Sequence, residues 1–357
     1  MSRIRVLVVE DSATVRAHLK DVLGSDAEIE VVGEAEDGKH AIELCRRLRP
    51  DIVTLDMMIP MMSGLAVTEY IMAHFPIPIL IVSASTNRGE LFRTYDALAA
   101  GAVDVLEKPT GQEPEGQWER RFLSTVKLVS RIKVITHPRL RIGALGRAAS
   151  IAPSELPIAT PGKYSVVAIG ASTGGPAAVV EVLRALPAPY RIPVILVLHI
   201  GEPFAAAFAD WLDGQTPHSV SYARDGEPFA EVQGRVVMAP ADRHLVIQNN
   251  MLRLTGAPER HSCRPSVDVL FESVAQAFGA SAAACLLTGM GRDGAAGLLE
   301  IRRAGGLTIA QDEATSVVYG MPREALLLGA AQRILPLDEI GPALASLAGS
   351  SPGRRLA

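Results

Sequence analysis

The chain has 357 residues, of which 48% are hydrophobic and 21% are charged, and its formal net charge is −4. This length suits two domains that each bury a core, and the composition is typical of a globular chain rather than a disordered one. Because non-specific nucleic-acid binding needs clustered positive charge, and no run of lysine and arginine stands out, we expect no nucleic-acid partner.

Membrane insertion and cysteine-based sites also lack a signal in the sequence. No stretch approaches the roughly 18 apolar residues needed to span a bilayer, and the run Val6–Val9 is too short for a signal peptide. We therefore expect a cytoplasmic protein. Cys45, Cys263 and Cys285 form no CxxC pair, so we interpret them as ordinary thiols rather than metal ligands or disulfides.

Residues 1–110 alternate strand-like and helix-like segments, which predicts a first α/β domain with a doubly wound parallel sheet. Its expected strands are continuous apolar runs, as in a sheet buried on both faces: Ile4–Val9, Ile29–Val32, Ile52–Leu55, Ile79–Val82 and Val103–Leu106. Helical patterns lie between them, one of them ending at Leu23 and the others at Gly38–Leu48, Ala66–Phe75 and Arg88–Ala100.

The stretch 111–163 has a different composition. Its segment 118–135 predicts one amphipathic helix, and four prolines with little apolar periodicity follow in His137–Lys163. We therefore interpret 111–163 as a linker that contains a helix, not as a third core.

Residues 164–345 resume the alternation and predict a second doubly wound α/β domain, with 346–357 as a flexible tail. The expected strands are Val166–Ile169, Val194–Leu198, Val236–Ala239, Leu245–Ile247, Met251–Leu254, Ala283–Leu287 and Leu307–Ala310. The expected helices are Ala177–Leu186, Ser266–Phe278 and Ala295–Ala304.

Polar residues follow the strands of the first domain where each strand ends: Glu10 and Asp11, Asp56, Ser83 and Lys108. In an open parallel sheet these carboxyl ends gather at one edge. Carboxylates are ligands that Mg²⁺ prefers, an aspartate can accept a phosphoryl group, and a lysine can offset its charge. Taken singly, the acidic pair is also compatible with a helix N-cap and the lysine with an exposed surface.

The motifs VVEDS, LDMMIP, VSAS and EKP make residues 1–110 resemble the response-regulator receiver domain. The resemblance implies phosphorylation at Asp56, Mg²⁺ bound by Glu10, Asp11, Asp56 and the carbonyl of Met58, a switch hydroxyl at Ser83 and a phosphate-binding Lys108. One position departs from the family pattern. Val105 occupies a switch position that is often aromatic.

The second domain opens with a strand, a glycine-rich turn and a helix pattern around Ser172, within Gly170–Pro176. The segment fits GxSxG, the pattern of a nucleophilic serine on a tight turn. It matches neither common phosphate-loop pattern, although a serine in a purely structural turn stays possible.

A nucleophilic serine needs a base and an orienting acid. His199 ends the strand Val194–Leu198, so it is expected at the same sheet edge, although a histidine in an apolar run is often only a core residue. Asp293 lies in a second strand–glycine–helix segment and is the candidate acid, with a helix N-cap as the alternative. The chain order serine, histidine, aspartate differs from that of α/β-hydrolases.

Residues 165–337 resemble the chemotaxis methylesterase family CheB through IGASTGGP, LHI, DGEP, MAPADRHL, RPSVDVLFESVA, LTGMGRDGAAG and ATSVVYGMP. The resemblance implies a triad of Ser172, His199 and Asp293, with the backbone N–H groups of Thr173 and Met290 binding the oxyanion and no cofactor for the hydrolase. The segment Ile200–Phe204 departs from the family's usual Met-Pro-Pro.

The two resemblances together imply a phosphorylation-activated serine hydrolase for adaptation in chemotaxis. It would demethylate glutamate methyl esters and deamidate glutamines on chemoreceptors, with a chemotaxis histidine kinase as phosphodonor. We hypothesise that the unphosphorylated receiver covers the catalytic cleft. The alternative is a receiver-controlled adaptor, in another chemosensory pathway, whose hydrolase site does not turn over. A DNA-binding regulator fits less well, because no basic helix-turn-helix is present.

Overall fold

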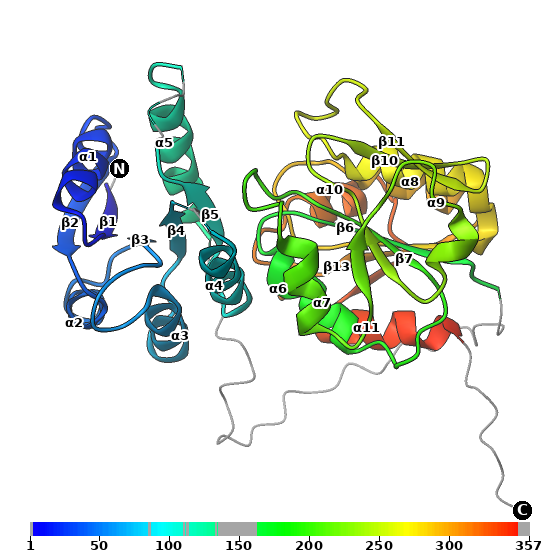
Figure 1. The fold of residues 1–357 in the computed structure, drawn as a ribbon, viewed down its shortest axis with the longest axis horizontal. Helices are drawn as coiled ribbons and strands as arrows, with labels where there is room; N and C mark the ends of the chain where they lie inside the picture. Colours follow the sequence, from blue (N-terminus) through cyan, green and yellow to red (C-terminus); the bar gives the residue numbers. More distant parts are fainter. Residues whose placement is uncertain are drawn as a thin grey trace, which may run out of the picture. The chain divides into compact units, whose positions relative to one another are not determined.

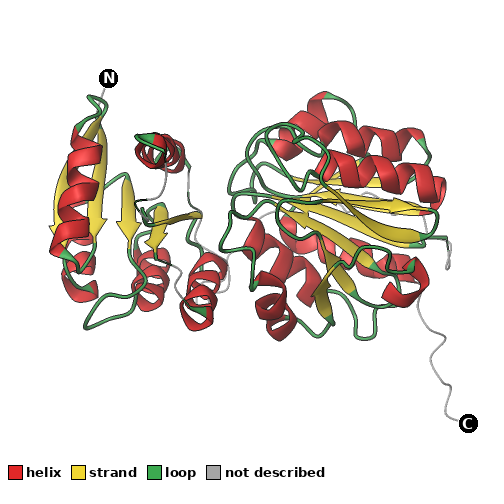
Figure 2. Cartoon of the chain, turned by 45° about the horizontal axis from the view of Figure 1, so that its top comes forward, coloured by secondary structure: helices red, strands yellow, loops and turns green. Residues whose placement is uncertain are grey.

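The computed structural model describes residues 3–84, 87–109, 111, 114–132, 134 and 163–348. The chain divides into two compact units, Met1–Arg141 and Ile142–Ala357, and each has its own parallel sheet (Figure 1). Helices cover both faces of each sheet (Figure 2), as expected for strands that are apolar on both sides. The predicted fold class, two doubly wound α/β domains, is confirmed.

The sheet of the first unit has the strand order β2-β1-β3-β4-β5, the flavodoxin-like order. Its strands are β1 (Ile4–Val9), β2 (Ile29–Ala35), β3 (Ile52–Leu55), β4 (Ile79–Ser83) and β5 (Asp104–Glu107). Its helices are α1 (Ala13–Gly24), α2 (Gly38–Leu48), α3 (Gly64–His74), α4 (Arg88–Ala99) and α5 (Gln117–Val129). The strand order reverses between β1 and β3, so the residues that follow these two strands border one crevice.

Helix α5 corrects the prediction of a linker helix over 118–135. Trp118 and Phe122 are buried, their rings stack with centroids 4.9 Å apart, and Trp118 Nε1 donates to the carbonyl of Glu107 at the end of β5. The helix therefore covers the first sheet and belongs to that domain. The helix ends at Val129. The N–H groups that follow donate to carbonyls three residues earlier, as Ile132 N–H does to Val129, which is the 3₁₀ pattern rather than the α-helical one.

The second unit has a seven-stranded parallel sheet in the order β14-β13-β12-β6-β7-β9-β8 and a separate two-stranded hairpin. The sheet contains β6 (Val166–Ala171), β7 (Val194–Leu198), β8 (Val220–Tyr222), β9 (Val236–Met238), β12 (Ala282–Leu286), β13 (Leu307–Gln311) and β14 (Arg333–Leu335), and the hairpin pairs β10 (His244–Gln248) with β11 (Met251–Thr255). The strand order reverses between β6 and β12, where such folds place their ligand crevice.

Helices α6 (Gly175–Arg184), α7 (Phe208–Gln215) and α11 (Leu337–Ala345) cover one face of the second sheet, and α8 (Val267–Phe278), α9 (Ala295–Arg303) and α10 (Met321–Leu327) cover the other (Figures 1 and 2). Strand β6 is buried along its whole length. Full burial of each aliphatic side chain stabilises the fold by about 1.5–3 kcal/mol relative to exposure.

The C-terminal boundary also differs from the expectation of a flexible tail over 346–357. Residues Ser346–Ala348 form a short 3₁₀ turn whose Leu347 is buried, because its apolar side chain continues the packed face of α11. The rest of the expected tail, 349–357, and residues 135–162 of the expected linker lie outside the described residues. Within the described part of the chain, no helix has the length and apolarity to cross a membrane.

Candidate active site and acidic pocket

Ser172 lies directly after β6, at the point where the strand order of the second sheet reverses. Its backbone N–H donates to the carbonyl of Thr288 (3.0 Å), which follows β12, and its carbonyl accepts from Gly175 at the start of α6 (2.6 Å). The side chain is partly exposed. A serine on a tight turn at this crevice has the placement that the GxSxG interpretation requires.

The loop after β12 packs against this serine. A Cβ added to Gly289 would lie 2.8 Å from Ser172 Cβ and 2.3 Å from Met321 Sδ, so only glycine fits this close approach. The next residue, Met290, is thereby brought beside the serine turn. Neither its backbone N–H nor that of Thr173 donates a hydrogen bond to any described residue, which leaves both free to meet an oxyanion.

His199 is tied to the same edge through the backbone, because its N–H donates to the carbonyl of Ala171, the residue before the serine (3.0 Å). Its ring Nε2 lies 2.9 Å from Asp293 Oδ2. That bond assigns the proton to Nε2, so Nδ1 carries the lone pair when the ring is neutral, and Cys263 Sγ lies 3.8 Å from Nδ1. Among the described residues, no hydrogen bond joins the ring to the Ser172 hydroxyl.

Asp293 is buried, and four donors hold its carboxylate. Oδ1 accepts from the Ser266 hydroxyl (2.7 Å) and the Asp268 N–H (3.1 Å), while Oδ2 accepts from His199 and the Val267 N–H (2.7 Å). Because the three residues 266–268 form the N-terminus of α8, the helix dipole also favours the negative charge. Burial alone would raise the pKa of Asp293, but the bonds from His199, Ser266 and Val267 lower it below its ordinary value.

The charge on Asp293 has a direct effect on the base. Burial lowers the pKa of His199, but the hydrogen bond to Asp293 and the adjacent Cys263 outweigh it and raise this pKa from 6.5 to about 9. The pair is therefore built to stabilise an imidazolium, which is the form that a general base reaches after it takes a proton.

The geometry decides between the structural alternatives for these side chains. Asp293 does not cap α9, because Gly294 occupies the N-cap position of that helix. The His199 side chain is 16% exposed, so it borders the crevice rather than the inner core. In the first unit Ser12 is the N-cap of α1, so neither Glu10 nor Asp11 has that role.

Sequence reasoning missed two side chains of this site. Ser266 was assigned only to the start of a helix, yet its hydroxyl anchors Asp293. Cys263 was interpreted as an ordinary thiol, yet its Sγ lies 3.8 Å from His199 Nδ1. A serine before an apolar helix does signal an N-cap, but the second contact of each residue joins segments far apart in the chain, which no local pattern reveals.

The first unit has an acidic pocket at the carboxyl edge of its sheet. Lys108 Nζ lies 2.8 Å from Glu10 Oε2 and 2.9 Å from Asp56 Oδ2, and both carboxylates are buried. Burial raises the pKa of Glu10, whereas the hydrogen bond from Lys108 acts in the opposite direction. Asp11 is exposed at the rim, with a carboxylate oxygen close enough to those of Glu10 and Asp56 to share one cation.

Two observations fit the prediction that this pocket binds Mg²⁺ and a phosphoryl group. Three carboxylates face one lysine, which leaves negative charge for a hard cation to balance. The Ser83 hydroxyl is buried and, among the described residues, has no hydrogen-bond partner, although such groups are normally paired. Met58 lies two residues after Asp56 with a side chain that is 44% exposed, and the ligand role of its carbonyl stays a prediction.

Known proteins resemble both units. A family model described as CheB methylesterase matches residues 167–344, and one described as response regulator receiver domain matches residues 6–114. A relative from Anaeromyxobacter dehalogenans, named protein-glutamate methylesterase/protein-glutamine glutaminase 2, is 44% identical over 344 residues, which cover 96% of this chain and 97% of the relative.

A relative of the same name from Pseudomonas aeruginosa is 43% identical and covers 96% of both chains. A solved structure, the CheB methylesterase catalytic domain of Thermotoga maritima, is 34% identical, covers 52% of this chain and 98% of its own, and has a TM-score of 0.49.

Proposed function

The chain belongs to the CheB methylesterase family, and we propose that it hydrolyses glutamate methyl esters and deamidates glutamines on chemoreceptors, under control of its receiver domain. The observation that carries this proposal is the hydrogen bond between His199 and Asp293 at the sheet edge where Ser172 follows β6. A buried carboxylate there holds Nε2 of the histidine, and the histidine N–H donates to Ala171, the residue before a serine on a tight turn.

The proposed reaction follows from this arrangement. His199 Nδ1 takes the Ser172 hydroxyl proton as Oγ attacks the ester carbonyl, and the N–H groups of Thr173 and Met290 stabilise the oxyanion. The C–O bond to the methoxy group breaks, and His199 returns the proton so that methanol leaves. Water then repeats the sequence on the acyl enzyme, releasing the glutamate carboxylate and the free serine.

Deamidation uses the same side chains. The serine attacks the carboxamide carbon of a glutamine, and His199 protonates the departing nitrogen so that ammonia leaves. Hydrolysis of the same acyl enzyme yields glutamate. Because both substrates converge on one intermediate, one triad supports both reactions.

Control is proposed to begin at Asp56, which accepts a phosphoryl group from a histidine kinase. Mg²⁺ would be held by Glu10, Asp11, Asp56 and the carbonyl of Met58, and would supply positive charge against the phosphoryl oxygens. Lys108 supplies a further positive charge, and the unpaired Ser83 hydroxyl can donate to the phosphoryl group.

Methanol release from methylated receptor membranes tests the hydrolase assignment. We expect Ser172→Ala to lower the rate by about 10⁴-fold or more, since the nucleophile is lost. Thr173→Ser, next to it, keeps the backbone N–H and serves as the matched control. A protein that only binds receptors would release no methanol in either form, and full activity in Ser172→Ala would overturn the triad.

A further inference from the structure

Cys263 is held against the base of the candidate triad by a tight turn. Its N–H and carbonyl both pair with Arg260 (2.9 and 3.1 Å), and the two residues between, His261 and Ser262, have φ of 53° and 59°. Positive φ at both central positions defines a narrow hairpin turn that usually favours glycine or asparagine. Non-glycine residues in this conformation are strained, and such strain concentrates at functional sites.

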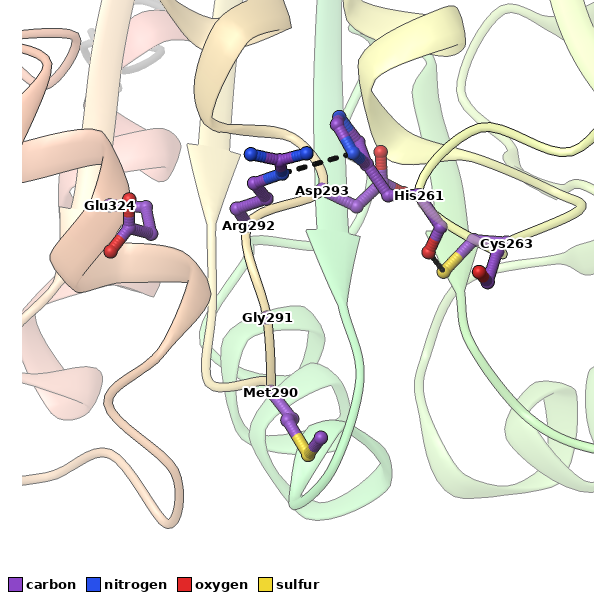
Figure 3. A pocket seen from close by; sticks show the side chains of 8 residues that line it. His261, Cys263, Met290, Gly291, Arg292, Asp293 and Glu324 are labelled. Carbon is purple, nitrogen blue, oxygen red and sulfur yellow. Dashed lines mark hydrogen bonds between the residues drawn. The ribbon is translucent and has the colours of Figure 1, made fainter.

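Polar contacts fix this turn in place. Arg260 Nη1 lies 2.7 Å from Glu272 Oε2, His261 Nε2 lies 3.1 Å from the buried Asp268, and Arg292 Nε donates to His261 Nδ1 (3.1 Å; Figure 3). The position of the Cys263 thiol is therefore set by its surroundings, while the residue stays partly exposed to solvent.

The separation of the two donor atoms matches a bridging zinc ion. With Zn–S of about 2.3 Å and Zn–N of about 2.0–2.1 Å, tetrahedral geometry sets sulfur and nitrogen roughly 3.6 Å apart. Cys263 Sγ and His199 Nδ1 are 3.8 Å apart. An ion can therefore join them with little movement of either side chain.

Asp293 contacts the other ring nitrogen of His199, Nε2, rather than the nitrogen that faces Cys263. His199, Cys263 and Asp293 form one compact group of possible ligands. A carboxylate offers about four lone-pair sites, and Asp293 already accepts four hydrogen bonds. Asp293 therefore keeps its hydrogen bond from His199 Nε2–H. In such a carboxylate–histidine–metal arrangement the carboxylate fixes the orientation of the ring and raises the basicity of the nitrogen that binds the metal.

We propose that His199 Nδ1 and Cys263 Sγ bind Zn²⁺, or another divalent cation that prefers sulfur and nitrogen, and that the bound ion inhibits the enzyme. Binding displaces water molecules from the ion and releases to solvent the thiol proton and, where the imidazole is protonated, its Nδ1 proton. A cavity of about 560 Å³ is lined in part by Cys263 and Asp293, so it borders the sulfur side of the site and leaves room there for water ligands of the ion (Figure 3).

Inhibition follows because the bound ion is coordinated by the lone pair of His199 Nδ1, which would otherwise accept the serine proton. This half of the inference rests on the proposed hydrolase function, whereas metal binding itself does not. The oxygen ligands of the acidic pocket favour Mg²⁺, so the two sites differ in the cation that each prefers.

Cobalt binding tests the site directly. The full chain, freed of metal and held in excess Mg²⁺, is titrated with Co²⁺ as a spectroscopic stand-in for Zn²⁺. We expect a thiolate-to-cobalt absorption band in the wild type, displaced by Zn²⁺, and its loss in both Cys263→Ser and His199→Gln. Cys45→Ala and Cys285→Ala are matched controls that keep the band, because both thiols are buried and burial raises their pKa.

Zinc inhibition of methanol release is measured on the same proteins, each relative to its own metal-free rate. We expect Cys263→Ser to need at least about tenfold more Zn²⁺ for half-inhibition than the wild type, since a metal ligand is lost. Cys45→Ala should match the wild type.

The two measurements separate the possible failures. A band without any methanol release would contradict the hydrolase proposal and leave the metal site standing. An active enzyme with no band, a band that persists in Cys263→Ser, or equal zinc sensitivity in Cys263→Ser and wild type would overturn the metal site.

Discussion

At the scale of single residues, the site depends on how Asp293 is held. Its four donors are His199, which follows β7, and three groups at the N-terminus of α8, so one carboxylate joins the histidine to the start of that helix. The negative charge is kept without protonation, and it can stabilise positive charge on His199 during the reaction.

The raised pKa of His199 predicts how activity depends on pH. Below about pH 9 the ring is mostly protonated and cannot act as a base, so kcat/KM should rise as the pH approaches about 9. The measurement is metal-free kcat/KM from about pH 6 to about pH 10, with Ser172→Ala giving the non-enzymatic background. A profile already flat at neutral pH would contradict this prediction.

Ser266 is predicted to be a positioning residue, because it touches Asp293 rather than the reacting atoms. Ser266→Ala should lower kcat/KM by roughly 10–100-fold, the effect of losing a hydrogen bond to a charged group. It should also shift the midpoint of the pH profile downward, since Asp293 is left less able to hold the imidazolium.

Ser266 has a second contact that needs a control, because its hydroxyl also accepts from Val269 N–H as the N-cap of α8 (3.4 Å). Losing a cap costs about 1 kcal/mol of stability and would not move the pH midpoint. Ser266→Thr keeps the hydroxyl and should restore both properties. If the midpoint of the pH profile is unshifted in Ser266→Ala, Ser266 acts only as the N-cap of α8.

At the scale of elements, apolar runs were predictable, including the three-residue β9, and short elements without such a run were not. Strands such as β1 and β6 are buried along most of their length, so their runs identify them directly. Strands β8 and β14 have three residues each, too few for a period to emerge. Helix α11 was missed because Pro342 lies inside it, and proline normally argues against a helix interior.

The three candidate triad residues were predictable from the sequence, but the contacts that support them were not. Ser172, His199 and Asp293 follow strands of one parallel sheet, so chain order and the edge rule already place them together. The contacts of Ser266 and Cys263 could not be foreseen, since they depend on how α8 and the turn before it pack across the sheet edge.

Helix α5 yields a stability prediction that tests its assignment to the first domain. Phe122 is fully buried, so Phe122→Ala should lower the free energy of unfolding of that domain by about 3–5 kcal/mol. Chemical denaturation followed by Trp118 fluorescence measures the shift. Arg120→Ala, at an exposed position of the same helix, is the control and should change stability by less than about 0.5 kcal/mol. A small effect of Phe122→Ala on the free energy of unfolding would contradict the assignment of α5 to the first domain.

At the scale of the whole molecule, two parallel sheets carry two chemistries at equivalent places. Each has its candidate site at the carboxyl edge where the strand order reverses, between β1 and β3 in the first unit and between β6 and β12 in the second. In the proposed function, Asp56 takes a phosphoryl group and Ser172 carries acyl transfer. Receiver control of the hydrolase then requires that phosphorylation of Asp56 alters the rate at Ser172.

Methanol release from methylated receptor membranes, with and without acetyl phosphate, tests that requirement most directly. We predict that acetyl phosphate with Mg²⁺ raises the rate of the wild type several-fold. Asp56→Asn should keep the basal rate but lose the stimulation, because its amide cannot form the acyl phosphate. Stimulation that persists in Asp56→Asn, or a wild-type rate that acetyl phosphate leaves unchanged, would contradict a receiver-controlled methylesterase.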